Sequence, residues 1–105
     1  MSEATEHWPF DQPNNCATFT MRQVMDKAEP ILLVTHDEND HGWQFIGSTE
    51  ASMEDAMLVT LKSIVAIDPS VVEVADLPPG WQAVRSAPGQ PWMRRKHPGF
   101  SEDER

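Results

Sequence analysis

The residues best equipped for chemistry lie together in the segment His-Asp-Glu-Asn-Asp-His, residues 36–41. Two imidazoles and three carboxylates within this segment are a ligand set that could hold a transition metal. The same residue types are also typical of a solvated turn, because Asp and Asn side chains bond to nearby backbone groups. We therefore favour a hairpin loop here and keep a metal-binding protein or small enzyme as the alternative. The residues that would carry that alternative are His36, Asp37, Asp40 and His41.

Cys16 and His36 form a second candidate, since a thiol and an imidazole can act as nucleophile and base. They fall on separate predicted strands, and a lone cysteine is more often a small buried residue than a catalytic nucleophile. The chain has no glycine-rich phosphate loop, no Gly-x-Ser-x-Gly elbow and no zinc-protease helix motif. The sequence therefore predicts a protein that is not an enzyme, with no catalytic residue, no cofactor and no metal ligand assigned.

The charge of the chain points away from nucleic acid and towards basic partners. Its 105 residues include 17 Asp and Glu against 8 Lys and Arg, for a formal charge of -9. Such a chain is repelled by DNA, RNA and anionic lipid unless its cations cluster. The densest cluster of cations is Arg94, Arg95 and Lys96, and three charges can contact only a few phosphates. We expect no nucleic-acid partner, whereas a basic protein would be attracted.

The sequence also predicts a soluble, cytoplasmic protein. Residues 1–10 have no basic start followed by an apolar region, as a secretory signal would. The longest apolar stretches, 31–34 and 64–67, are far too short to span a bilayer. Cys16 is the single cysteine, so no internal disulfide framework can form.

Hydrophobic patterning and turn signals predict a series of short elements. The expected strands are residues 16–19, 31–35, 43–46, 81–85 and 91–95, and residues 57–59 are a brief strand candidate. The expected helices are residues 21–28, a very short one near 52–55, 61–67 and 69–75. Thr20 with Gln23 matches a capping box, Thr60 caps the next helix, and Asp68 precedes a proline at a first helical position.

These elements predict an α+β domain built on a single antiparallel sheet of about five short strands. Two to four short helices are expected to pack mainly on one face. Residues 1–15 are interpreted as an extended N-terminal arm, 16–98 as one globular domain and 99–105 as a mobile acidic tail. The side chains expected to be largely buried are Ile31, Leu33, Phe45, Ile64 and Trp81.

Four tryptophans are many for this length, and they suit either a small core or an interface. Trp43 and Trp81 are assigned to the core. Trp8 and Trp92 lie near the chain ends beside polar residues and are candidates for a partly exposed patch. Together with two loop carboxylates they are the candidate partner-binding residues: Trp8, Asp37, Asp40 and Trp92. The chain is expected to be a monomer or a homodimer.

The order of motifs resembles a bacterial family of small domains of unknown function that is grouped with immunity proteins of polymorphic toxin systems. The motifs are WPFDQP at 8–13, T-x-x-QV at 20–24, GWQF at 42–45, ADLPPGW at 75–81 and PW at 91–92. The resemblance covers about residues 8–98. It implies a small, cytosolic, non-enzymatic protein that binds and blocks a partner such as a toxin domain, and it transfers no catalytic residue.

Overall fold

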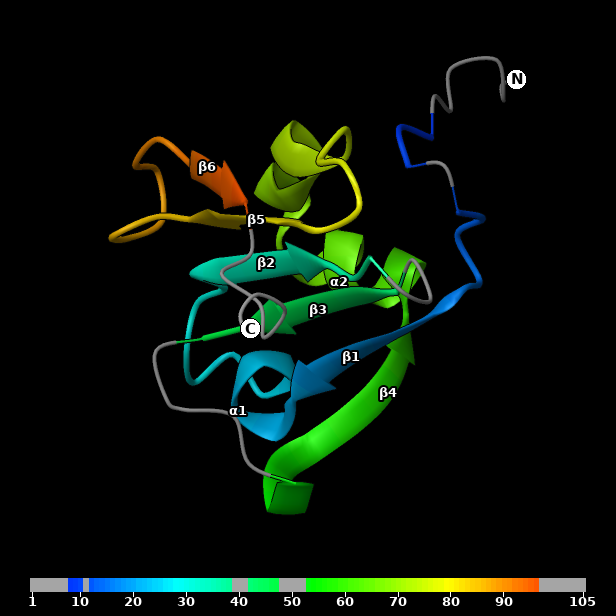
Figure 1. The fold of residues 1–105 in the computed structure, drawn as a ribbon. Helices are drawn as coiled ribbons and strands as arrows, with labels where there is room; N and C mark the ends of the chain where they lie inside the picture. The colour runs from blue at the N-terminus through cyan, green and yellow to red at the C-terminus, as the bar shows by residue number, and fades with distance from the viewer. Residues whose placement is uncertain (1–7, 11, 39–41, 48–52, 97–105) are drawn as a thin grey trace, which may run out of the picture.

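The fold is built on one β-sheet (Figure 1). In a computed structural model of the chain, the residues described are 8–10, 12–38, 42–47 and 53–96. The strands are β1 (Ala17–Met21), β2 (Leu33–His36), β3 (Trp43–Ile46), β4 (Ala56–Thr60), β5 (Trp81–Val84) and β6 (Met93–Lys96). The helices are α1 (Arg22–Met25), α2 (Leu61–Ile67) and the 3₁₀ helices η2 (Met53–Asp55) and η3 (Pro69–Val74). The expected α+β class is confirmed.

The sheet differs from the expectation in strand number and in one pairing. It has six strands in the order β4-β1-β3-β2-β5-β6, and β1 runs parallel to β3. All other neighbours are antiparallel, including the predicted hairpin of β2 and β3. The parallel pair arises because β2 does not lie next to β1. β3 returns antiparallel to β2 and takes the position between β1 and β2, where it runs parallel to β1. Such pairing of distant strands has no local sequence signal.

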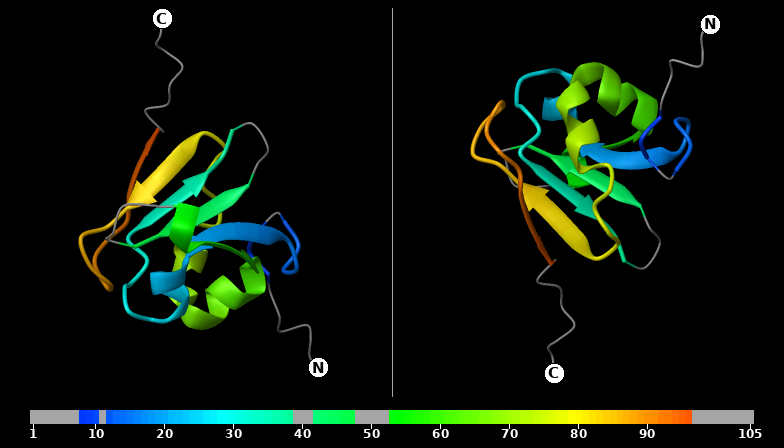
Figure 2. Two further views of the ribbon diagram at one scale, coloured as in Figure 1. Left: turned by 90° about the horizontal axis from the view of Figure 1, so that it is seen from below. Right: turned by 90° about the horizontal axis from the view of Figure 1, so that it is seen from above.

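Figure 2 shows α1, α2 and η3 gathered on one side of the sheet, as expected. The core lies between these helices and the strands, and among its fully buried members are Val34, Phe45, Leu61, Ile64, Val71 and Val74. Ile31, Phe45 and Ile64 are buried as predicted. Leu33 and Trp81 are only half-buried, so this part of the prediction was wrong.

The two exceptions have physical reasons. Successive strand residues point to opposite faces, so Leu33 lies on the face opposite to that of the fully buried Val34. Trp81 is the first residue of β5, and on β6 it is paired with Lys96, which is exposed. This end of the strand pair is therefore open to water, and Trp81 is only half-buried.

Two of the three predicted helix caps are present. The backbone N–H of Ser63 donates to Thr60 Oγ1 at 3.2 Å, and that of Ser70 donates to Asp68 Oδ1 at 3.0 Å. Thr20 is not a cap, because it lies inside β1 and its hydroxyl donates to the carbonyl of Phe45 at 2.7 Å. α1 instead follows the extended residue Met21, which makes no side-chain cap.

Some predictions fall outside the described residues. These are residues 1–7 of the arm and the whole tail at 99–105. In the described part of the arm, Trp8 lies against the buried Phe10, with ring centroids 5.5 Å apart. Within the ranges described, no helix has the length and apolar character needed to cross a membrane.

Candidate functional site

A single row of side chains crosses the sheet face opposite the helices. Paired residues on neighbouring strands share a face, and the strand registers therefore align one residue from each strand. In sheet order the row is Leu58, Phe19, Gln44, Thr35, Gln82 and Arg95. At its far end Arg95 Nε donates to Gln82 Oε1 at 2.6 Å. The row is thus apolar on β4 and β1, polar but uncharged on β3, β2 and β5, and cationic on β6.

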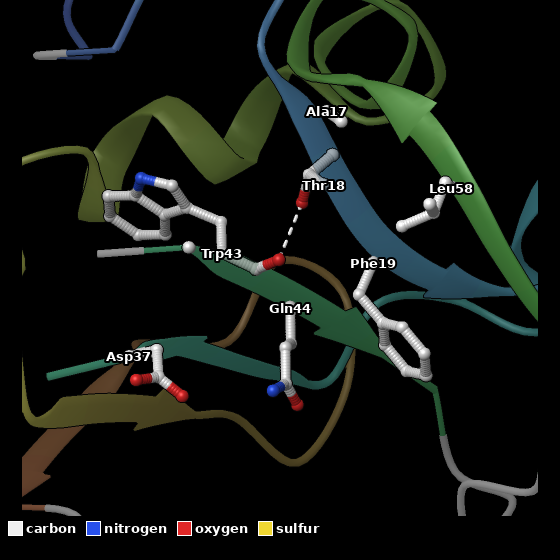
Figure 3. A pocket seen from close by; sticks show the side chains of 8 residues that line it. Ala17, Thr18, Phe19, Asp37, Trp43, Gln44 and Leu58 are labelled. Atoms are coloured by element: carbon white, nitrogen blue, oxygen red, sulfur yellow. Dashed lines mark hydrogen bonds between the residues drawn. The ribbon is translucent and has the colours of Figure 1, made fainter. Parts of the chain in front are cut away.

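A pocket of about 290 Å³ lies at the apolar end of this row (Figure 3). Ala17, Phe19 and Leu58 supply apolar lining, and Asp37 and Gln44 supply polar groups. Figure 3 shows the side chains of Phe19, Gln44 and Asp37 projecting to the same side of the strands. The pocket therefore joins an apolar wall to a carboxylate and an amide.

Buried hydrogen bonds hold the strands that form the pocket. Thr18 Oγ1 donates to the carbonyl of Trp43 at 2.7 Å. This bond and the bond from Thr20 Oγ1 to the carbonyl of Phe45 both link β1 to β3. The backbone N–H of Asp37 donates to the carbonyl of Gly42 at 2.7 Å, which ties the end of β2 to the start of β3. Apart from Asp37, directly after β2, and Gly42, directly before β3, the lining residues belong to paired strands, which hold side chains more firmly than loops do.

The two edge strands of the sheet have opposite chemistry. β6 ends in Arg94, Arg95 and Lys96, and charges on an edge strand discourage association with other strands. β4 has the sequence Ala-Met-Leu-Val-Thr, without charge or proline, and 75% of the surface of Leu58 is exposed. An exposed apolar edge beside a pocket is typical of an interaction surface.

His36 is a buried core residue and does not belong to the hairpin loop, so this part of the loop prediction was wrong. It is the last residue of β2, and its ring stacks on Trp43 with centroids 4.0 Å apart. Its Nδ1 lies 2.7 Å from the carbonyl oxygen of Leu77, and since a carbonyl only accepts, Nδ1 carries the proton. Gly80, at φ +88°, turns the chain so that its N–H donates to the carbonyl of His36.

The nucleophile–base candidate is not assembled in the described structure. Cys16 precedes β1, and β3 separates β1 from the strand that carries His36. The thiol of Cys16 points to the carbonyl of Ala17 at 3.6 Å, and the imidazole bonds Leu77.

The candidate partner-binding residues occupy different places. Asp37 lines the pocket, and Asp40 lies outside the described residues. Trp8 is half-buried and its indole N–H donates to the carbonyl of Gln12 at 2.7 Å. Trp92 is half-buried beneath the guanidinium of Arg85, 4.2 Å from the ring centroid. The N-terminal segment and the β5–β6 connection lie on opposite sides of the molecule in every view, so the two tryptophans do not form one patch (Figures 1 and 2).

Phe19, Gln44 and Leu58 were not predicted as site residues. Each was recognised as part of a strand, but only the register of β1 with β3 and β4 brings them side by side. One usable signal was the uncharged run at 56–60, which is unusual for an exposed edge strand.

The described residues contain no group of three or more His, Cys, Asp or Glu side chains that could hold a metal ion. Asp40 and His41 of the metal-binding alternative fall outside this description. Comparisons with protein-family models, curated proteins and solved structures give no match to the chain.

Proposed function

We propose that this chain is a non-enzymatic protein-binding domain whose partner is a basic protein, and that it acts as an immunity protein on a toxin domain. The observation that carries the proposal is the exposed Leu58 on the uncharged edge strand β4, next to the pocket. The immunity role comes from the motif order, which resembles that of such a family.

The exposed apolar surface supports binding to a protein. Leu58 on β4 is paired with the half-buried Phe19 on β1, and Met53 just before β4 is 85% exposed. Water contact with such surface is unfavourable by roughly 25 cal/mol per Å², and a partner that covers it recovers this free energy. The pocket, at about 290 Å³, is at the small end for a metabolite but suits a single protein side chain.

The charge of the chain supports a basic partner over a second copy. Two copies, each with a formal charge of -9, repel each other at long range. A basic protein is attracted instead, and its encounter with the chain accelerates at low salt. Asp37 places one of these negative charges directly in the pocket.

The surroundings of His36 favour binding over catalysis. Its Nδ1 bonds the Leu77 carbonyl and its ring face is covered by Trp43, so the residue serves the core. A general base must reach the substrate proton, and a buried, stacked imidazole is poorly placed for that.

The test compares two matched surface variants in affinity capture from the native cell. Leu58→Lys and Met93→Lys each add one cation at an exposed position, 75% and 69% exposed, on opposite edge strands. A captured protein is then purified, and its association with each variant is measured at low and high salt. We expect a basic protein that binds the parent and Met93→Lys alike, loses at least about tenfold in affinity for Leu58→Lys, and binds more weakly as salt rises. Its toxic activity should be blocked by a stoichiometric amount of the chain.

The proposal is wrong if every captured protein binds Leu58→Lys as tightly as the parent. It is also wrong if the purified chain turns over a small molecule and a folded His36 variant does not, since that result would promote the enzyme alternative.

A further inference from the structure

The outer edge of β4 presents backbone groups that no described strand pairs with. β4 is the outermost strand of the sheet, and β1 is its neighbour on the inner side (Figure 1). All five residues of β4 pair with β1 in one unbroken register, so the strand is regular and has no bulge. A regular edge strand turns alternate N–H and C=O groups towards its free side.

The register identifies the residues whose backbone groups point outward. In an antiparallel pair, residues that exchange hydrogen bonds alternate with residues that do not, and the latter turn their backbone groups to the other side. The N–H of Leu61 donates to the carbonyl of Cys16 at 3.0 Å, which continues the β1–β4 register by one bonded pair. Counted back from this pair, every second residue of β4 faces outward. The outward-facing residues are Ala56, Leu58 and Thr60.

Of the two described edges of the sheet, only β4 lacks the features that prevent a further strand from pairing. The long cationic side chains of β6 oppose such pairing, whereas β4 has no charge, no proline and no bulge. The side chain of Leu58, in the middle of β4, is 75% exposed. The free edge is therefore open at its centre as well as unprotected by its sequence.

The charge of the chain selects the kind of strand that this edge would accept. Pairing with β4 of a second copy would bring together two chains that each have a formal charge of -9. An extended basic segment would be attracted instead. In such strand addition, main-chain hydrogen bonds supply the affinity and alternate side chains supply the specificity. The residue opposite Leu58 would place its side chain on the sheet face that holds the pocket.

We propose that an extended segment of the basic partner adds to the free edge of β4 as a further strand, hydrogen-bonded to the outward backbone groups centred on Leu58. This proposal rests on the protein-binding function proposed above and names the way in which the partner is held.

The probe for strand addition is the peptide acetyl-Lys-Thr-Val-Thr-Val-Thr-Lys-amide, titrated into isotope-labelled protein while NMR follows amide hydrogen exchange. In the free chain, the N–H of Leu58 should exchange faster than those of Met57 and Val59, which face β1. The peptide should saturably slow exchange at Ala56, Leu58 and Thr60. Contact through side chains alone would not slow every second amide, so this alternation is specific to an added strand.

Two matched peptides separate the contributions of hydrogen bonding and charge. The same peptide N-methylated at its central residues keeps the side chains and the charge but loses the backbone donors. It should bind at least about tenfold more weakly. A peptide with Glu in place of both Lys residues should bind at least about fivefold more weakly at low salt, and this difference should shrink as salt rises.

Two variants at one position locate the backbone contact. Leu58→Pro removes the outward N–H, and proline is tolerated where an edge strand turns its N–H to solvent. Leu58→Ala shortens the same side chain and keeps the N–H. Leu58→Pro should weaken the peptide at least about tenfold, and Leu58→Ala less than about threefold. If Leu58→Pro does not fold, the exchange pattern of the parent decides alone.

Strand addition is refuted if the peptide does not slow the alternate amides, if N-methylation has no effect, or if the two variants weaken binding equally. Equal binding of the acidic peptide would overturn the selection of a basic segment. Outward amides that are already slow in the free chain would also overturn the proposal, and a dimer in sedimentation would then identify a second copy as the occupant.

The two proposals fail separately. A captured partner that depends on Leu58, together with a peptide that does not slow the alternate amides, would keep the protein-binding function and remove strand addition. If the peptide behaves as expected but no captured partner depends on Leu58, the proposed function fails while the open edge of β4 stands as a strand-binding site.

Discussion

Arg85 Nη2 lies 2.8 Å from Asp68 Oδ2, which joins the end of β5 to the start of η3. The Arg85 side chain is 2% exposed, and it also donates from Nε to the carbonyl of Ile31 and from Nη1 to Ser70 Oγ. Trp92 covers the guanidinium from one side. This buried cation therefore links strand, helix and the β5–β6 connection.

Removing the charge of Asp68 should destabilise the fold far more than removing that of Asp76. Asp68→Asn keeps the oxygen that caps η3 but leaves the buried guanidinium without its counter-charge, at a cost of about 2–3 kcal/mol. Asp76→Asn breaks the exposed pair with Arg94 and should cost less than about 1 kcal/mol. Urea unfolding of both variants measures the difference. Equal losses would show that burial of the Arg85 pair has no energetic consequence.

The pH dependence of the Asp76 carboxyl should follow from its partner. A hydrogen bond from Arg94, at 2.8 Å, lowers the pKa of Asp76 below its ordinary value of 3.8. Because the folded-state pKa is lowered, the contribution of the pair to stability is present above 3.8 and disappears as pH falls through the folded-state pKa. The effect on stability is small, since the Asp76 side chain is 78% exposed.

Arg94→Gln should raise this pKa towards the ordinary value, and the carbon chemical shift of the Asp76 carboxyl during an acid titration reports it. Arg95→Gln is the control, because Arg95 bonds Gln82 on the other face of β6. An unchanged midpoint in Arg94→Gln would contradict the assignment of the shift to that partner.

His36→Ala should lower the free energy of unfolding by about 3 kcal/mol. The substitution removes a buried ring stacked on Trp43 and leaves the Leu77 carbonyl without that donor. Glu38→Ala, two residues later and exposed, should change stability by less than about 0.5 kcal/mol. Denaturant unfolding monitored by tryptophan fluorescence distinguishes the two, and a His36→Ala protein as stable as its parent would place the ring outside the core.

Two apolar strand residues should respond unequally to truncation. Phe45→Ala opens a cavity in the core and should cost about 3–5 kcal/mol. Leu33→Ala should cost only about 1–2 kcal/mol, because Leu33 is half-buried on the face away from the helices. Midpoints of thermal or urea unfolding give both values, and a larger loss for Leu33→Ala would mean that this face is covered.

Local signals in the sequence were sufficient for much of the secondary structure. The caps at Thr60 and Asp68 were predictable because a cap needs only a side-chain oxygen and a backbone N–H two or three residues away. The strand at 43–46 was predicted with its bounds, since Trp43 and Phe45 recur with the period of a strand and fall on one face, with Gln44 and Ile46 on the other.

Interactions between distant residues decided the rest. Thr20 has the sequence signature of a cap, but it is paired with β3 and β4 inside the sheet, and its hydroxyl donates to the carbonyl of Phe45. Four polar residues follow His36 in the sequence, which predicts a loop. In the structure its ring is buried and stacks on Trp43, and its Nδ1 bonds the carbonyl of Leu77. Each outcome depends on a contact partner that local patterns do not contain.

The candidate site shows the same division. The sequence by itself supplied the acidity of the chain, the uncharged run of β4 and the carboxylate of Asp37. Only the tertiary structure placed Leu58, Phe19 and Gln44 in one row, because the parallel register of β1 with β3 sets which side chains are neighbours. A shift of one residue in that register would turn Phe19 or Gln44 to the opposite face relative to its neighbour, and the pocket would lose either its apolar wall or its amide.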